Sequence, residues 1–345
     1  MQYKFYTTSY KVWEDMLTAI QHSQCSIYWE SFMFIDSEDD QLITEIFEIL
    51  AKKANAGITV KIIADSFGSF YLSAKAKKYL EDAGAEVLFF RNYKFWKRNH
   101  KKILIVDEKT AFIGGVNLAK QHRHSLDLHL RIEEVHIIQH LLRSFAKTYY
   151  LSGGKNTINI KKSQFAKLKI QFIEHWPMQK GRTLKKYYQK AFLSARNNIT
   201  IATPYFVPHV WMIKILHQAA KRGVRIDIII PEKTNHFFNN VANYVFASLV
   251  YKPNINFYFV KKFIHAKALL IDDTEGLVGS QNIDAASFDY NIESGVAFQR
   301  QDMVKNLKMV LEEWKQNSQL LNFAQNKKWH HRLLEVIFKL LHPVL

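Results

Sequence analysis

The chain has 345 residues, of which 48% are hydrophobic and 14% aromatic, so a substantial folded core is expected and a disordered chain is excluded. Lysine and arginine number 48 against 31 acidic residues, and this net charge of +17 favours a phosphate-rich partner, either nucleic acid or an anionic membrane. The single cysteine, Cys25, excludes an intramolecular disulfide and a cysteine-based zinc site, and it fits a reducing compartment.

The N-terminal residues have no apolar stretch behind a basic start, so we expect no signal peptide. The sequence also has no run of about 18 uncharged apolar residues, so we expect no segment that spans a bilayer. Together these features predict a cytoplasmic protein.

Strand-like and helix-like segments alternate along the first half of the chain. Residues 25–35 read as a strand, residues 36–57 as a helix with acidic residues at its start, and residues 58–65 as a strand. Residues 73–90 read as a helix, a glycine stop and another strand. The stretch NHKKILIVD, residues 99–107, reads as a short strand although it begins with charged side chains. This order is typical of an α/β fold.

The second half repeats the same rhythm. Residues 198–208 read as a strand, residues 211–223 as a helix and residues 224–231 as a strand. Gly57 and Gly223 hold matching places in a shared helix–glycine–strand pattern. A period of about half the chain indicates two similar lobes and not a solenoid.

We therefore predict two similar α/β lobes, each a mixed β-sheet flanked by helices, related by a pseudo-two-fold axis. The first lobe covers residues 1–150 and the second covers residues 170–320. The polar and basic residues 151–169 are expected to connect them, and residues 321–345 to form a basic amphipathic tail.

One motif occurs twice, once in each half. HKKILIVDEKTAFIGGVN (100–117) and HAKALLIDDTEGLVGSQN (265–282) share the pattern H-x-K-x4-D-x6-G-[G/S]-x-N. Side chains alternate faces along a strand, so the histidine and the lysine project from the same face, and the aspartate points away. We expect the aspartate to fix the end of the strand. The residues are His100, Lys102, Asp107 and Asn117 in the first copy and His265, Lys267, Asp272 and Asn282 in the second.

Pairing the lobes places two histidines, two lysines and two asparagines around one point, which makes a site for a phosphodiester. A neutral imidazole can attack phosphorus and form a phosphohistidine, and a protonated one can give its proton to the departing alcohol oxygen. Two ammonium groups and two amides would stabilise the non-bridging oxygens. Such a site does the work that a metal often does, so we expect neither metal nor cofactor.

A nucleophilic imidazole needs an acceptor at its far nitrogen. Glu293, in YNIESG, follows His265 by nearly the same interval as that by which Asp127, in LDLHLRIE, follows His100. These two residues are candidates for the orienting carboxylates.

The doubled motif resembles the phospholipase D superfamily. The similarity extends to the bacterial cardiolipin synthase branch through RNHKKILIVD (98–107), LHLRIE (128–133), ATPYFVP (202–208), FIHAKALLID (263–272) and VGSQNIDAASFDYNIE (278–293). The resemblance spans about residues 10–320. It implies two phospholipase D-type lobes with the active site at their interface, a covalent phosphohistidine and no metal.

Carried over residue by residue, the resemblance assigns the motif histidines, lysines and asparagines to the site, with Asp127 and Glu293 behind the histidines. It further implies attack by His100 and proton donation by His265. Many cardiolipin synthases begin with two membrane-spanning helices, which this sequence does not carry, so we expect membrane attachment from elsewhere.

Two segments are candidates for attachment to an anionic membrane surface. Residues 89–102 interleave aromatic and cationic side chains, which fits a membrane interface, a basic loop or a surface that stacks single-stranded nucleic acid. Residues 327–345 combine an apolar helical face with basic residues, which fits an in-plane anchor or a helix packed on the body or on a partner chain.

Other polar residues have less specific expectations. His122, His124 and His129 are close in sequence, but without a second ligand cluster we expect surface or packing roles and not a metal site. Glu30 and Tyr205 are expected to end strands near the cleft, where they shape it or belong to the core.

The leading hypothesis is a cardiolipin synthase-like phosphatidyltransferase that joins two phospholipids, with phosphatidylglycerol the simplest substrate. The alternative is a hydrolase of the same chemistry, either a phospholipase D or a metal-independent nuclease, because the positive charge suits DNA as well as lipid. A third class is a non-catalytic membrane-binding module, against which the two intact motifs speak. The expected partners are phospholipid substrates and an anionic membrane surface, with nucleic acid second.

Overall fold

A computed structural model describes residues 2–91, 97–156, 158, 160, 169–177, 183–235 and 237–321. Most of the predicted connector, the centre of the basic aromatic segment (92–96) and the predicted tail from residue 322 onward lie outside the described residues. Within the described ranges, every helix is too short or too polar to cross a bilayer.

The first lobe contains a seven-stranded sheet with three helices on its outer face and one on its inner face. The strands are β1 (Tyr3–Thr8), β2 (Ser26–Ser31), β3 (Thr59–Asp65), β4 (Glu86–Phe90), β6 (Lys102–Val106), β7 (Thr110–Gly114) and β8 (Leu126–Ile132). Their order in the sheet is β1-β8-β7-β6-β2-β3-β4. The helices are α1 (Ser9–Gln21), α2 (Gln41–Asn55), α3 (Ala74–Asp82) and α4 (Val135–Leu151), with the short 3₁₀ helix η2 (Lys120–His122).

The second lobe repeats this arrangement. Its strands are β9 (Ile170–His175), β10 (Asn198–Ala202), β11 (Arg225–Pro231), β12 (Ile255–Val260), β13 (Ala268–Ile271), β14 (Glu275–Gly279), β15 (Asn291–Phe298) and β16 (Ser318–Leu320). Its helices are α5 (Thr183–Ser194), α6 (Val210–Lys221), α7 (Phe237–Val250) and α8 (Gln301–Gln316), with the π-helical turn η3 (Ala286–Tyr290).

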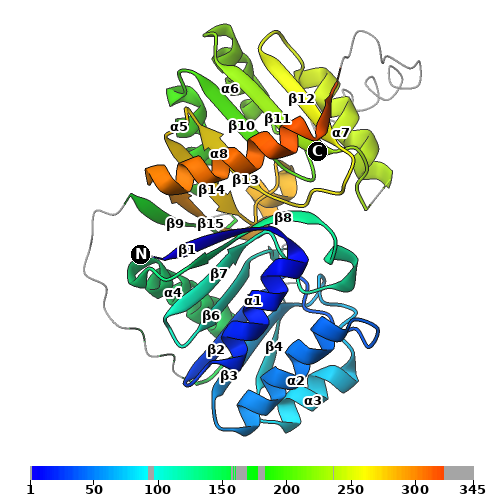
Figure 1. The fold of residues 1–345 in the computed structure, drawn as a ribbon, viewed down its shortest axis with the longest axis vertical. Helices are drawn as coiled ribbons and strands as arrows, with labels where there is room; N and C mark the ends of the chain where they lie inside the picture. Colours follow the sequence, from blue (N-terminus) through cyan, green and yellow to red (C-terminus); the bar gives the residue numbers. More distant parts are fainter. Residues whose placement is uncertain are drawn as a thin grey trace.

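The order of strands confirms the predicted pair of similar lobes. In the second sheet the order β9-β15-β14-β13-β10-β11-β12 matches β1-β8-β7-β6-β2-β3-β4 of the first, and β16 adds one strand beside β12. Figure 1 shows the two lobes one above the other, with α1 to α3 on the outside of the first and α5 to α7 on the second. The helices α4 and α8 follow the matching strands β8 and β15.

The local sequence explains where the helices begin and end. Helix α2 starts at Gln41 because the side chain of Asp40 accepts a hydrogen bond from the Ile43 amide, 3.2 Å away, which caps the helix. It ends before Gly57, whose φ of +83° favours a residue without a side chain. The apolar residues predicted to line its inner face are buried; these are Leu42, Ile43, Ile46, Phe47 and Leu50.

Three apolar cores hold the layers together. One lies between α1 to α3 and the outer face of the first sheet, and a second lies between α5 to α7 and the outer face of the second sheet. The third joins the inner faces of both sheets with α4 and α8, and includes Phe145, Leu270 and Leu307. Each fully buried side chain of this size contributes roughly 2 kcal/mol to stability, so the continuous central core fixes one lobe against the other.

The strand predicted over residues 99–107 is broken in two. Residues Arg98–Asn99 form β5, which pairs in parallel with β15 of the second lobe, and the chain joins its own sheet only at Lys102. His100 lies in this crossing, and its amide donates to the carbonyl of Ile292 at 2.9 Å. The break arises because the first lobe lends a short strand to the second.

Candidate active site

The two motif histidines lie at equivalent places in the two sheets. Strand β6 runs antiparallel to β2, with Lys102 opposite Ser31, and β13 runs antiparallel to β10, with Ala268 opposite Ala202. Each histidine, just before its strand, therefore lies at the carboxyl ends of the parallel strands β2 and β3 or β10 and β11. This is the edge of an open α/β sheet where ligands bind.

His100 is oriented by a carboxylate of the other lobe. Its Nδ1 lies 3.0 Å from both carboxylate oxygens of Glu293, which stands on β15. The hydroxyl of Ser280 also donates to Glu293. A carboxylate only accepts, so Nδ1 carries the proton and Nε2 keeps a lone pair.

His265 is oriented in the same way from the opposite direction. Its Nδ1 lies 2.8 Å from Oδ2 of Asp127, which stands on β8 of the first lobe. A Cβ on Gly115 would lie 2.1 Å from Oδ1 of Asp127, so this motif glycine makes room for the carboxylate. The two carboxylates singled out from the sequence thus lie behind the two histidines, and each pair crosses between lobes.

The two motif lysines are buried beside the histidines. Lys102 Nζ donates to the carbonyl of His100 at 2.6 Å, and Lys267 donates to the carbonyl of His265. Burial lowers the pKa of Lys267 to about 8 and that of Lys102 well below its ordinary value. Lys267 also lowers the pKa of His100, and Lys102 that of His265, so the four groups lie close together across the lobe interface.

Burial keeps both imidazoles neutral near pH 7. It lowers the pKa of His100 to about 4, against the opposing effect of Glu293 and with the help of Lys102. Burial, reinforced by Lys267 and Lys102, lowers the pKa of His265 well below its ordinary value. Burial alone would raise the pKa of Glu293, but its contacts with His100 and Lys102 outweigh that effect and lower it.

The two motif asparagines lie in the same buried region, 2% and 5% exposed. Oδ1 of Asn117 accepts from the Met33 amide at 3.3 Å. The backbone amide of Asn282 donates to Oγ of Ser287 at 2.9 Å. Each asparagine is therefore anchored at the turn that follows its β-hairpin.

The two motif aspartates lie at the far ends of their strands from the histidines. Both have positive φ, 52° at Asp107 and 50° at Asp272, where each hairpin turns. Their carboxylates accept backbone amides from the segment that enters the neighbouring strand, at distances of 2.7–3.1 Å. The donors are Gln24, Cys25 and Ser26 for Asp107, and Arg196, Asn197 and Asn198 for Asp272. These bonds fix strand ends outside the pocket.

Sequence reasoning missed three residues that contact the site. Ser280 occupies the variable G/S position of the motif, which was the available signal for it. Phe32 packs edge-on against His100, with ring centroids 4.8 Å apart, and His122 packs against His265 at 4.7 Å. His122 was expected to have a surface or packing role, and it is buried. Among the described residues, no three His, Cys, Asp or Glu side chains cluster to hold a metal ion.

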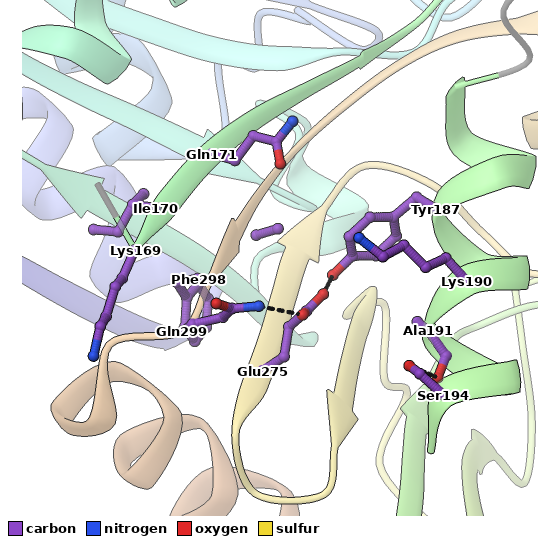
Figure 2. Close-up of a pocket in the computed structure, with 11 residues that line it drawn as sticks. Lys169, Ile170, Gln171, Tyr187, Lys190, Ala191, Ser194, Glu275, Phe298 and Gln299 are labelled. Atoms are coloured by element: carbon purple, nitrogen blue, oxygen red, sulfur yellow. Dashed lines mark hydrogen bonds between the residues drawn. The ribbon is translucent and has the colours of Figure 1, made fainter. Parts of the chain in front are cut away.

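A separate cavity of about 190 Å³ opens between α5 and the strands β9, β14 and β15. Figure 2 shows Glu275 in its wall, where it accepts hydrogen bonds from Tyr187 at 2.5 Å and from Gln299 at 2.7 Å. The residues that line this cavity include Lys169 and Lys190 but none of the motif residues. The buried cluster of motif residues, and not this cavity, carries the candidate chemistry.

Comparison with known proteins agrees with this geometry. A family model described as "Cardiolipin synthase, PLD-like domain" matches residues 16–149 and 188–331. The chain is 27% identical to cardiolipin synthase 2 of Bacillus anthracis, over 98% of this chain and 70% of the relative. It is 30% identical to a cardiolipin synthase of Clostridium perfringens, over 88% of this chain and 68% of the relative.

Among solved structures, phosphatidylserine synthase of Haemophilus influenzae matches with a TM-score of 0.78 at 13% identity, over 99% of this chain and 93% of that one. This likeness supports the same two-lobed fold. The family match covers both lobes and both copies of the motif. The chain therefore belongs to the cardiolipin synthase family of proteins with phospholipase D-like domains.

Proposed function

We propose that this phosphatidyltransferase moves a phosphatidyl group from one phospholipid to a hydroxyl of a second. Phosphatidylglycerol in both roles gives cardiolipin and glycerol. The observation that carries the proposal is the pair of imidazole–carboxylate contacts that cross between the lobes at 3.0 and 2.8 Å. Because these contacts occupy Nδ1 of each histidine, Nε2 of one ring is left to attack phosphorus and Nε2 of the other to give a proton to the leaving oxygen.

In the first step, Nε2 of neutral His100 attacks phosphorus. The bond from phosphorus to the headgroup oxygen breaks, and that oxygen takes a proton from Nε2 of His265. His265 must be protonated for this role although burial lowers its pKa. The bound phosphodiester supplies the compensation, because its negative charge offsets the two lysines and raises the pKa of the imidazole.

In the second step, the hydroxyl of the acceptor lipid attacks the phosphohistidine. Nε2 of His265, now neutral, accepts the hydroxyl proton while the new P–O bond forms and the P–N bond to His100 breaks. Both histidines return to their starting states, so the cycle balances in atoms and charge.

Charge stabilisation falls to the lysines and amides. Lys102 and Lys267 face the two imidazoles, and the asparagines anchor the turns beside them. One preorganised donor aimed at a developing oxyanion is worth about 10²–10³ in rate.

Burial of the site supports transfer over hydrolysis. His100 and His265 are only 7% and 4% exposed. A phosphohistidine in such a pocket is shielded from water and persists until an acceptor alcohol enters. The relatives likewise do not favour the alternative of a phospholipase D or a nuclease.

We also propose that the enzyme works at an anionic membrane surface. Phe67, Phe70 and Tyr71 lie in the loop after β3 and are exposed, Phe70 at 75%. Asp65 ties this loop to the site, because its carboxylate accepts the amides of Phe67 at 3.0 Å and of Asn99, next to His100, at 2.8 Å. The exposed aromatics therefore lie on a loop that is hydrogen-bonded to the residue beside His100.

The second lobe presents aromatics at the equivalent place. Phe237 and Phe238 follow β11 at the start of α7 and are exposed, Phe238 at 82%. We call these residues and the three of the first lobe the aromatic rim. Exposed cations lie in the loops beside it: Arg91, Lys233, Lys261 and Lys262. Aromatic side chains prefer the lipid interface and cations prefer anionic headgroups. The rim would therefore hold the site around His100 and His265 at the membrane surface.

The product assay tests the reaction directly. Purified protein incubated with phosphatidylglycerol should yield cardiolipin and glycerol, measured by mass spectrometry, and the His100→Ala variant should yield neither. Phosphatidic acid as the sole product would contradict transfer and indicate a phospholipase D. Metal-independent cleavage of DNA, without any lipid product, would indicate the nuclease.

A further inference from the structure

A fully buried lysine stands between the two motif residues of the first lobe. Lys101 lies between His100 and Lys102, and its ammonium forms an ion pair with Glu30 on β2 at 2.7 Å. Both side chains have zero exposure. A buried charge is costly unless it is paired and hydrogen-bonded, so this pair needs further partners.

Those partners come from both lobes. The ammonium of Lys101 donates to Oγ of Ser144 and to Oγ1 of Thr148 on α4, each at 2.8 Å. It lies 3.5 Å from the carboxylate of Glu174 on β9, which also accepts from Ser144 at 2.6 Å. One ammonium therefore joins β2 and α4 of the first lobe to β9 of the second.

The network lies directly beside the contact between His100 and Glu293. Strand β9 pairs with β15 so that His175 is opposite Glu293 and Glu174 is opposite Ser294. Lys101 directly follows His100 in the chain, and Glu174 directly precedes the residue that pairs with Glu293. Two neighbouring charged contacts thus cross the lobe interface side by side.

The second lobe lacks the residues for such a network. The residue between its motif histidine and lysine is Ala266, and the strand pairing places Ala202 where the first lobe has Glu30. Both alanines are buried. The fold of a lobe therefore does not require charged residues at these two positions. The buried ion pair is specific to the lobe that carries His100.

We infer that Lys101, together with Glu30 and Glu174, is a positioning residue that holds His100 in register with Glu293 across the lobe interface. His100 lies in the short crossing between β5 and β6, where its amide donates to the carbonyl of Ile292 and its own carbonyl accepts from Lys102. Lys101 directly follows His100, and its ion pairs hold the chain from the side opposite the His100 ring. A displacement of about 1 Å at a reacting atom can cost about 10² in rate, so this anchoring sets the efficiency of attack.

The test compares a double variant with a matched control. Lys101→Ala with Glu30→Ala gives the first lobe the alanine pair of the second and leaves neither of its charges buried alone. The control is Lys61→Met, which removes another buried lysine of the same lobe. Lys61 also pairs with a carboxylate, Glu86 at 2.7 Å, and with a hydroxyl on α4, Tyr149 at 3.0 Å, but it does not adjoin the site.

Two measurements separate positioning from general stability. The rate of phosphohistidine formation with a short-chain phosphatidylglycerol should fall at least about 100-fold in the double variant, with KM within a factor of about three of wild type. The ¹⁵N spectrum of selectively labelled histidine should show His100 losing its fixed Nδ1–H tautomer while His265 keeps its own. The Lys61→Met variant should retain the wild-type rate and spectrum.

A second variant guards against misfolding, because Glu174→Gln keeps the shape of the network and should lower the rate by a smaller factor. A double variant with the rate of the Lys61→Met control and an unchanged His100 signal would overturn the inference. The rate measurement rests on the proposed function, but the ¹⁵N measurement of the His100 tautomer does not. If wild-type protein forms no phosphohistidine, the proposed function fails, and the His100 spectrum still decides whether Lys101 positions the ring.

Discussion

The two lobes present the same histidine and lysine from the same place in the same sheet, but they support them differently. In the first lobe, His100 faces both oxygens of Glu293, and a buried charged network lies behind it. In the second lobe, His265 faces one oxygen of Asp127, and alanines fill the equivalent space. The duplicated motif thus places identical side chains in different surroundings, which fits the proposed division of roles between the two histidines.

The largest expected effect separates the two histidines. His100→Ala should abolish turnover of a p-nitrophenyl phosphodiester, a loss of at least about 10⁴, because no nucleophile remains. His265→Ala should still release a burst of p-nitrophenolate, because this leaving group needs no proton. Stopped-flow absorbance measures the burst. A burst from His100→Ala and none from His265→Ala would reverse the assignment.

The carboxylates should sharpen the same comparison. Glu293→Gln and Asp127→Asn keep the size of each side chain but remove the charge that fixes a tautomer, so each should lower kcat by about 10²–10⁴. With the p-nitrophenyl substrate, Glu293→Gln should slow the burst, and Asp127→Asn should slow mainly the steady state. If the two variants slowed the burst and the steady state equally, the two histidines would not have separate roles in attack and proton transfer.

The pH profile should report the charge of the buried groups. The attacking imidazole must be neutral, so kcat/KM should fall about tenfold per unit below pH 4, through the lowered pKa of His100. Both lysines must be charged and His265 protonated, and burial lowers the pKa of all three, so kcat/KM should also fall as the pH rises, at the latest through the pKa of Lys267 at about 8. Arginine stays charged, so Lys267→Arg should make the fall above pH 8 less steep. An unchanged slope above pH 8 in Lys267→Arg would exclude a contribution from this lysine.

The smallest expected effect concerns the aromatic rim. Replacing Phe70 and Tyr71, or Phe237 and Phe238, with alanine should weaken binding to phosphatidylglycerol vesicles roughly tenfold, because each side chain would bury apolar surface in lipid. Vesicle sedimentation measures this. Activity on a monomeric short-chain substrate should not change. Tyr150→Ala, an exposed aromatic away from the rim, is the control, and a matching loss in that variant would refute the rim as a docking surface.

The sequence predicted the architecture well because the same motif and the same order of strands and helices occur in both halves. A motif repeated at one period indicated two lobes, and strand alternation brought His100 and His265 to the same edge of their sheets. The positions of Asp127 and Glu293 identified the carboxylates but not their partners, because each follows the histidine of its own half by a similar interval. Only the packing of one lobe on the other brings each histidine to the carboxylate of the opposite lobe.

Other features had no signal in the sequence. Strand alternation places Lys101 on the face opposite His100 and Lys102, but lysine is almost always exposed, so the sequence gives no sign that its ammonium is buried in an ion pair. The break in the predicted strand at His100 depends on β15, which lies near the other end of the chain and draws Arg98 and Asn99 into the second sheet. Contacts between distant parts of the chain set both features, and local propensity does not report them.

The exchange of carboxylates between the lobes has a consequence for the newly made protein. His100 is synthesised long before Glu293, so for much of synthesis the first half carries a histidine without the carboxylate that orients it. Under the proposed mechanism, neither lobe has an oriented histidine before the other lobe has packed against it. Activity toward phospholipids is therefore expected only from a chain in which both lobes are complete and packed together.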